Sequence, residues 1–267
     1  MIDSVKSIIA IASGKGGVGK STVAVNLAVA LHSEGLTIGL LDADIYGPSI
    51  AMMLGITDSD RPQSLDGKTI SPLIAYGVRT MSIGYLVDSS TPMVWRGPMA
   101  SGALKQMLQH TSWGPLDVLL VDMPPGTGDI QLTLSQSVQL AGAVIVTTPQ
   151  DIALLDAKRS VEMFAKVEVP ILGIIENMSA MQCSVCGNSE SVFGSGGGER
   201  IAKTYQTKLL GQLPLDSRVR EQGDVGNPLV LVQPESPVAQ SYFSIARSLI
   251  ERLSNRETSG SPDIIFD

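Results

Sequence analysis

Cysteine, histidine, aromatic and basic residues are all scarce in this sequence, and the shortages exclude several classes of protein. Two cysteines, Cys183 and Cys186, cannot supply the disulfide framework of a small secreted domain. Aromatic residues make up 4% of the chain and the net charge is −7, so a face for nucleic acid is not expected. No apolar run approaches the roughly 18 residues of a membrane span, and the first residues do not resemble a secretion signal. We therefore predict a cytoplasmic protein that binds neither nucleic acid nor membrane.

The sequence does contain a large apolar fraction arranged in short runs. Hydrophobic residues make up 43% of the 267 residues, enough for a sizeable core. Runs rich in β-branched residues alternate with helical stretches, which predicts an α/β fold: a mostly parallel central sheet with helices on both faces, in three layers. The expected strands are Ser7–Ala12, Ile38–Leu41, Val118–Val121, Ala143–Thr147, Ile171–Ile175 and Leu209–Leu213, and the expected helices are Lys20–His32, Met99–Gln109, Ala153–Phe164 and Val238–Leu253.

The domain organisation is predicted to be simple. Alternating apolar positions around Tyr76 and Gly77 predict a hairpin within residues 70–81. No linker divides the chain, so we expect a single domain over residues 1–253. The polar stretch SNRETSGSP follows directly and predicts a flexible tail over residues 254–267.

Residues 14–21 read GKGGVGKS and match the phosphate-binding pattern G-x-x-x-x-G-K-[ST]. The segment follows an expected strand and opens an expected helix, which is the context that this pattern requires. Glycines let the backbone wrap closely around phosphates, and the amino end of the helix adds free N–H donors and partial positive charge. Lys20 is expected to reach the β and γ phosphates, and the Ser21 hydroxyl to ligate Mg²⁺. We assign nucleotide binding to Gly14, Lys15, Gly16, Gly17, Val18, Gly19, Lys20, Ser21 and Thr22.

A second lysine, Lys15, follows the first glycine of the loop, and an ordinary phosphate loop does not need it. It could be a solvated surface charge. With it, KGGVGKST resembles the deviant Walker motif of the MinD, ParA and nitrogenase-iron-protein type of P-loop ATPases. In those proteins this lysine crosses a dimer interface to touch the partner's nucleotide, so the resemblance implies a nucleotide-sandwich homodimer. It also implies that Asn177, otherwise a turn residue, binds the adenine edge of ATP, and that Pro214 to Asp216 form a second base-contacting loop.

Three aspartates follow expected strands, at the sheet edge where open α/β folds bind their ligands. Asp42 and Asp44 lie in LLDADIYGPS, and Asp122 lies in LLVDMPPGTGD. We expect Asp122 to hold Mg²⁺, Asp44 to position or deprotonate the attacking water, and Asp42 to support Mg²⁺ and a switch loop. The roles of Asp42 and Asp44 could be exchanged, and a cap or turn is the alternative for all three. Gly126 and Gly128 fit a switch loop that senses the γ-phosphate.

Cys183 and Cys186 form a C-x-x-C pair whose two thiolates could share one metal centre. Two thiolates leave a tetrahedral zinc site or a cubane cluster half-built, and both histidines, His32 and His110, lie in or directly after expected helices far away in sequence. A symmetric dimer would supply four thiolates at its two-fold axis. A bridging iron–sulfur cluster, a shared zinc site, a redox dithiol and two inert cysteines all remain open.

Together the motifs resemble the Mrp (also called ApbC) branch of these ATPases, the ATP-binding iron–sulfur cluster carriers. The motifs are GKGGVGKST, LDADIYGPS, WRGPMASGALKQ, DMPPGTGD, TTPQDIAL, ENMS, C-x-x-C-G and FGSGGGE. The resemblance implies a homodimer with a labile bridging [4Fe-4S] cluster on Cys183 and Cys186, delivered to apo iron–sulfur proteins in reactions that use ATP and Mg²⁺. A positioning ATPase of the MinD or ParA type and a zinc-bridged regulatory dimer are the alternatives.

Overall fold

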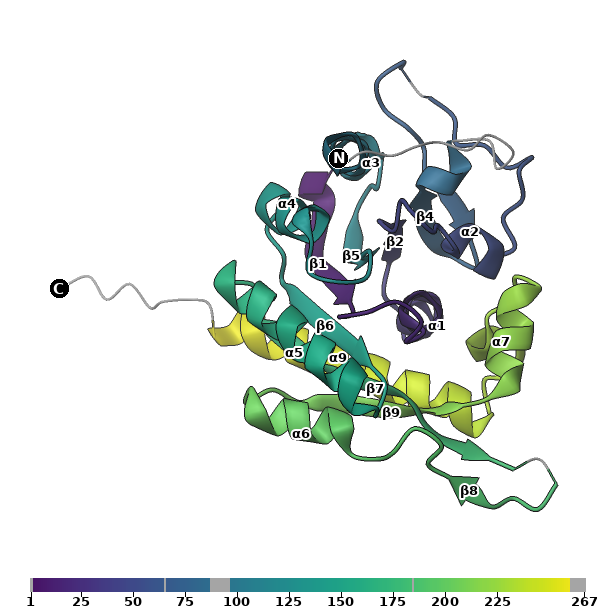
Figure 1. The fold of residues 1–267 in the computed structure, drawn as a ribbon. Coiled ribbons are helices and arrows are strands. Elements are labelled where there is room, and N and C mark those ends of the chain that lie inside the picture. The colour runs from purple at the N-terminus through teal and green to yellow at the C-terminus, as the bar shows by residue number, and fades with distance from the viewer. Residues whose placement is uncertain (1, 65, 87–96, 184, 260–267) are drawn as a thin grey trace.

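The computed structural model describes residues 2–64, 66–86, 97–183 and 185–259, which form a central sheet with helices on both faces (Figure 1). In the described chain the sheet has nine strands, of which eight follow the order β3-β4-β2-β5-β1-β6-β7-β8 and the ninth, β9, pairs with β7. Their bounds are Val5–Ala12 (β1), Ile38–Asp42 (β2), Leu73–Ala75 (β3), Val78–Ser82 (β4), Leu116–Asp122 (β5), Gly142–Thr147 (β6), Ile171–Gln182 (β7), Ser189–Glu190 (β8) and Leu209–Leu215 (β9). These strands pair in parallel except for β3 with β4 and β7 with β8, so the predicted, mostly parallel fold is confirmed.

Two hydrophobic cores lie on the two faces of the sheet, and the pleat of β1 shows why. Ile9 and Ile11 join one core, whereas Ile8, Ala10 and Ala12 join the other, because successive side chains of a strand point to opposite faces. The first core is covered by α1 (Lys20–Ser33), α2 (Ile50–Met53), α8 (Leu229–Val232) and α9 (Pro237–Ser259). The second is covered by α3 (Gly97–His110), α4 (Asp129–Ser137), α5 (Asp151–Lys166) and α6 (Gly197–Thr204).

The predicted hairpin is the antiparallel pair β3 and β4. Its turn residues, Tyr76 and Gly77, have φ of 52° and 78°, and two successive positive φ values are typical of the tight turns that suit the twist of a hairpin. The Tyr76 hydroxyl donates to the carbonyl of Gly226 at 2.7 Å. This bond ties the hairpin to the segment that follows α7 (Ser217–Asp224).

Two elements run far past their expected ends. Strand β7 continues from Ile175 to Gln182, and α9 continues from Leu253 to Ser259. Residues 260–267 of the expected tail lie outside the described residues, and the single-domain assignment stays a prediction. The apolar side chains of α9, such as Phe243 and Leu249, are buried in the first core. In the described ranges, no helix has both the length and the apolar character needed to cross a bilayer.

Candidate functional site

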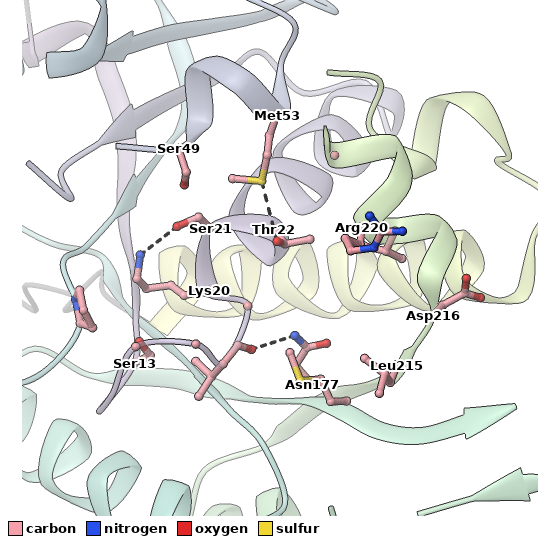
Figure 2. Close-up of a pocket in the computed structure, with 18 of the residues that line it drawn as sticks. Ser13, Lys20, Ser21, Thr22, Ser49, Met53, Asn177, Leu215, Asp216 and Arg220 are labelled. Carbon is pink, nitrogen blue, oxygen red and sulfur yellow. Dashed lines mark hydrogen bonds between the residues drawn. The ribbon is translucent and has the colours of Figure 1, made fainter. Parts of the chain in front are cut away.

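The predicted phosphate loop lies between β1 and α1 and lines a cavity of about 550 Å³ (Figure 2). This volume is in the range of pockets that hold small molecules. Parts of α2, β7, β9, α7 and α9 also contribute to the lining. The predicted site residues that line the cavity are Lys15, Gly16, Gly17, Val18, Gly19, Lys20, Ser21, Thr22, Asp44, Asn177, Pro214 and Asp216.

The glycines of the loop are needed for different reasons. Gly17 and Gly19 have φ of 83° and 79°, a left-handed conformation that residues with a Cβ rarely adopt. Gly14 has no such angle, but a Cβ there would lie 2.1 Å from the carbonyl carbon of Asp156 in α5. The loop is therefore seated directly on the backbone of α5, a contact between segments that are distant in sequence.

Lys20 and Asp122 form a buried ion pair beneath the loop. The Lys20 Nζ lies 2.7 Å from Oδ1 of Asp122 and also donates to the Ser21 hydroxyl at 3.2 Å (Figure 2). The second Asp122 oxygen, Oδ2, is buried and has no hydrogen-bond partner among the described residues. Burial raises the pKa of Asp122, and Lys20 opposes the shift. A buried carboxylate oxygen without a partner, near a serine hydroxyl, is the oxygen chemistry that the predicted Mg²⁺ roles of Ser21 and Asp122 require.

The strand register places Ser82, Asp42 and Asp122 side by side at the carboxyl ends of β4, β2 and β5. Asp42 is fully buried and accepts hydrogen bonds from the Ser82 hydroxyl at 3.0 Å and from three backbone N–H groups of residues 44–50. Burial, and next the charge of Asp122, raise the pKa of Asp42 to about 7. Both oxygens of Asp42 are therefore engaged by groups of the chain itself, and its roles toward Mg²⁺ and the switch loop stay predictions. Ser82 was missed, since its place at the end of a hairpin strand carries no chemical signal.

Asp44 is the third aspartate predicted for the site. Asp44 is partly buried and lines the cavity, and burial raises the pKa of its carboxyl against the influence of Lys20. A raised pKa makes a carboxylate a stronger base.

The predicted switch loop is held by hydrogen bonds at Gly126. The Gly126 N–H donates to the carbonyl of Ser13 at 2.9 Å, and Nε2 of Gln131 donates to the Gly126 carbonyl at 2.6 Å. Gln131, a buried polar residue of α4, was not predicted.

Two of the residues predicted to contact the base, Asn177 and Asp216, lie on the side of the cavity away from the Lys20 ammonium (Figure 2). Asn177 donates from Nδ2 to the Val18 carbonyl at 2.8 Å, so it braces the phosphate loop. Asp216 caps α7 and forms an ion pair with Arg218 at 2.6 Å, and this partner holds the pKa of Asp216 below its ordinary value. Arg220 of α7 also lines the cavity. It was missed because a charged side chain on a short polar helix gives no binding signal in the sequence.

Cys183 and Cys186 lie in a hairpin that projects from the sheet where β7 turns into β8 (Figure 1). Cys183 pairs through its N–H with the Asn188 carbonyl at 2.8 Å, and the Gly187 N–H closes the turn onto the Cys183 carbonyl at 2.9 Å. Both thiols are free, and Cys186 is exposed. Hydrogen bonds from the backbone N–H groups of Cys186 and Val185 lower the pKa of the Cys183 thiol. The thiolate, which is the form that binds metals, is thereby favoured.

One chain offers two thiols and few other ligands at this hairpin. Within the described residues, no group of three or more His, Cys, Asp or Glu side chains is placed to hold a metal ion. The structure therefore places the cysteines together but leaves any tetrahedral centre on them incomplete in a single chain.

Residues 4–250 match the ParA family model, described as the NUBPL iron-transfer P-loop NTPase. The chain belongs to this family. The "Iron-sulfur cluster carrier protein" of Escherichia coli (strain K12) is 58% identical over 252 residues, which cover 94% of this chain and 68% of that protein. The "Iron-sulfur cluster transfer protein NUBPL" of Mus musculus is 48% identical over 254 residues, covering 94% and 79%. The resemblance that the motifs indicated is confirmed.

Solved structures similar to this NUBPL-family chain support the fold. A nucleotide-binding protein from Archaeoglobus fulgidus, in complex with ADP, is 34% identical and covers 91% of this chain and 93% of its own, with a TM-score of 0.77. The cell division ATPase MinD of Pyrococcus furiosus is 24% identical, with coverages of 92% and 99% and a TM-score of 0.70. The predicted P-loop NTPase fold is therefore confirmed.

Proposed function

We propose that this chain carries iron–sulfur clusters. As a homodimer it holds a bridging [4Fe-4S] cluster as cargo, and ATP binding with slow hydrolysis governs its delivery to apo-proteins. The observation that carries the proposal is that one strand, β7, lines the nucleotide-sized cavity and then ends in a free C-x-x-C hairpin. Relatives from Escherichia coli and Mus musculus are named for cluster carriage and transfer. We place this activity in the cytoplasm, without nucleic acid or membrane as partners.

Each group of residues in the nucleotide site has its own role. The phosphate loop and the amino end of α1 take the phosphates of ATP, with Lys20 as the charged partner. Asn177 and the segment 214–216 face the base, and Asp44 takes the proton of the attacking water. Ser21 and Asp122 offer the oxygens for Mg²⁺, which supplies charge neutralisation at the phosphates when bound.

The cysteine hairpin is suited to a cluster that is transferred to another protein. Each chain provides two thiols, so two chains around a two-fold axis provide the four that a [4Fe-4S] cluster needs. Cys186 and its neighbour Val185 are exposed. Ligand exchange requires direct access to the cluster. A cluster on this projecting hairpin is within reach of the thiols of a recipient protein.

Native mass spectrometry after anaerobic reconstitution with iron and sulfide tests the proposal. The expected product is a dimer that carries the mass of one [4Fe-4S] unit. Cys183→Ser should lose the cluster and remain folded, since the residue is partly exposed. Val185→Ser is the matched control, because it changes the same turn and keeps both thiols; it should retain the cluster.

Other products of the same experiment would contradict the proposal. A dimer that takes up one zinc and refuses iron would instead indicate a structural metal. A metal-free species that dimerises only with ATP would indicate a positioning ATPase.

A further inference from the structure

Strand β7 passes the nucleotide cavity before it reaches the cysteine hairpin. Asn177 and Met178, consecutive residues of the strand, both line the cavity. In a regular strand, consecutive side chains point to opposite faces of the sheet. Two consecutive lining residues are therefore not expected where a strand is regular.

The strand has a break at Met178. This residue has φ of 56°, in the left-handed region that is uncommon for residues other than glycine. The pairing of β7 with β9 shifts register between Asn177 and Met181. Such an irregularity re-aims a side chain and bends the strand, and a residue held in this conformation depends on its surroundings to keep it there.

Asn177 bonds to the phosphate loop, and Met178 lies beside it. The Asn177 Nδ2 donates to the Val18 carbonyl at 2.8 Å (Figure 2). A Cβ on Gly19 would lie 2.4 Å from the same Nδ2 and 3.7 Å from Cε of Met178. The surroundings that hold the break therefore include the loop that closes around the phosphates.

We infer that Asn177 and Met178 are positioning residues that couple nucleotide occupancy to the cysteine hairpin within a single chain. Cys183 lies roughly six strand residues, or about 20 Å, beyond Asn177 along the same strand. A nucleotide that displaces Asn177 or Met178 from the loop changes the bend at the break, and the paired strand beyond it carries the change to the thiols. The coupling exists only if the nucleotide binds the two arrangements of the break with different affinity. The inference rests on the proposed function in taking the cavity as the nucleotide site.

Thiol alkylation of the full-length, reduced, metal-free protein tests the inference. Cys183 and Cys186 are the whole cysteine content of the chain, so iodoacetamide labelling reports on the hairpin alone. The rate at each thiol is measured by peptide mass spectrometry, with and without Mg-ATP at a concentration shown by equilibrium dialysis to saturate the protein. For the native chain we expect the nucleotide to change the rate about fivefold, at the low end of typical coupling between sites.

The double variant Asn177→Ala/Met178→Gly removes both side chains from beside the loop. Glycine adopts the left-handed conformation without strain, so the strand can keep its break. At saturating nucleotide we expect its labelling rates with and without Mg-ATP to be equal. Met99→Ala is the matched control, because Met99 is an exposed methionine of α3 that does not line the cavity. It should keep the full response of the native chain.

Three outcomes would overturn the inference. One is a native chain that binds Mg-ATP without any change in thiol rate, and another is a double variant that responds like the native chain. The third is a response lost in Lys15→Ala at saturation, because it would place the coupling in the dimer instead of in one chain. A native chain that fails to bind Mg-ATP would overturn the proposed function as well, whereas the first three outcomes leave it standing.

Discussion

Replacing Gly14 by alanine tests whether the first glycine of the phosphate loop is needed for the stability of the protein in the absence of nucleotide. A Cβ at this position would lie 2.1 Å from the carbonyl carbon of Asp156, 2.2 Å from its oxygen and 2.6 Å from the Ala157 nitrogen. All three are backbone atoms of α5, which cannot rotate aside as the end of a side chain can. The loop or the helix must move by about an ångström, and overpacking of this kind costs about 1–3 kcal/mol. We expect Gly14→Ala to lower the free energy of unfolding by about 3 kcal/mol, at the upper end of that range, because backbone is obstructed.

Two neighbouring glycines provide matched controls. At Gly16 the nearest atom to a Cβ is Cγ of Pro125 at 3.9 Å, an ordinary contact, so Gly16→Ala should leave stability almost unchanged. At Gly17 a Cβ meets nothing within 4 Å, but φ is 83°. Gly17→Ala should therefore cost about 1 kcal/mol from conformation alone. The predicted order of destabilisation is Gly14, then Gly17, then Gly16.

Urea and thermal unfolding without nucleotide measure this order free of any contribution from bound phosphate. A loss of about 3 kcal/mol corresponds to a melting temperature lower by about 6–12 °C in a protein of this size. The reasoning fails if Gly14→Ala unfolds within about 0.5 kcal/mol of the native chain. It fails equally if Gly16→Ala is destabilised as much as Gly14→Ala.

Two further predictions concern the buried charges beneath the loop. Lys20→Met leaves Asp122 buried without its cation and should cost about 3 kcal/mol in urea unfolding at neutral pH, because breaking a buried ion pair strands the remaining charge. The double variant Lys20→Met/Asp122→Asn should recover at least half of that loss; an equally unstable double variant would contradict the argument. Asp42 has its pKa raised from 3.8 to about 7, so the folded state holds a proton that the unfolded state releases, and stability should fall by about 4 kcal/mol as pH rises from about 4 to 7. Asp42→Asn should make this decline clearly shallower, and an identical decline in the variant would show that Asp42 is not its source.

The fold was predictable from the sequence wherever a strand is buried on both faces. The strands β1, β2, β5 and β6 each contain a continuous apolar run, because neighbours in a parallel sheet and helices on both faces exclude water from it. The far half of β7 could not be predicted in this way. Its residues 178–182 are partly or fully exposed, and they are strand because β8 and β9 pair with them, not because their own sequence favours it.

The residues of the candidate site likewise differ in whether the sequence could predict them. The phosphate loop and its lysines were predictable because that chemistry lies within eight consecutive residues. Ser82 was not, because its hydroxyl donates to Asp42 on a strand that the sheet brings beside it. Such a residue becomes recognisable only after the strand order is known, since its partner is set by register. Gln131 was not, because its bonds to the carbonyls of Pro124 and Gly126 depend on how the loop before α4 folds.

The structure also gives the two lysines of the loop different surroundings. Lys20 is buried, and Asp122 neutralises its charge, so a phosphate must compete with a carboxylate for it. Lys15 is only partly buried and lines the cavity, and its ammonium has no hydrogen bond or ion pair within the part of the chain that the structure describes. In a protein of net charge −7, a lysine left free beside a phosphate loop keeps its full attraction for an anion. That is the property that a sandwich dimer requires of it, because the anion that Lys15 would meet there belongs to the nucleotide of the second chain.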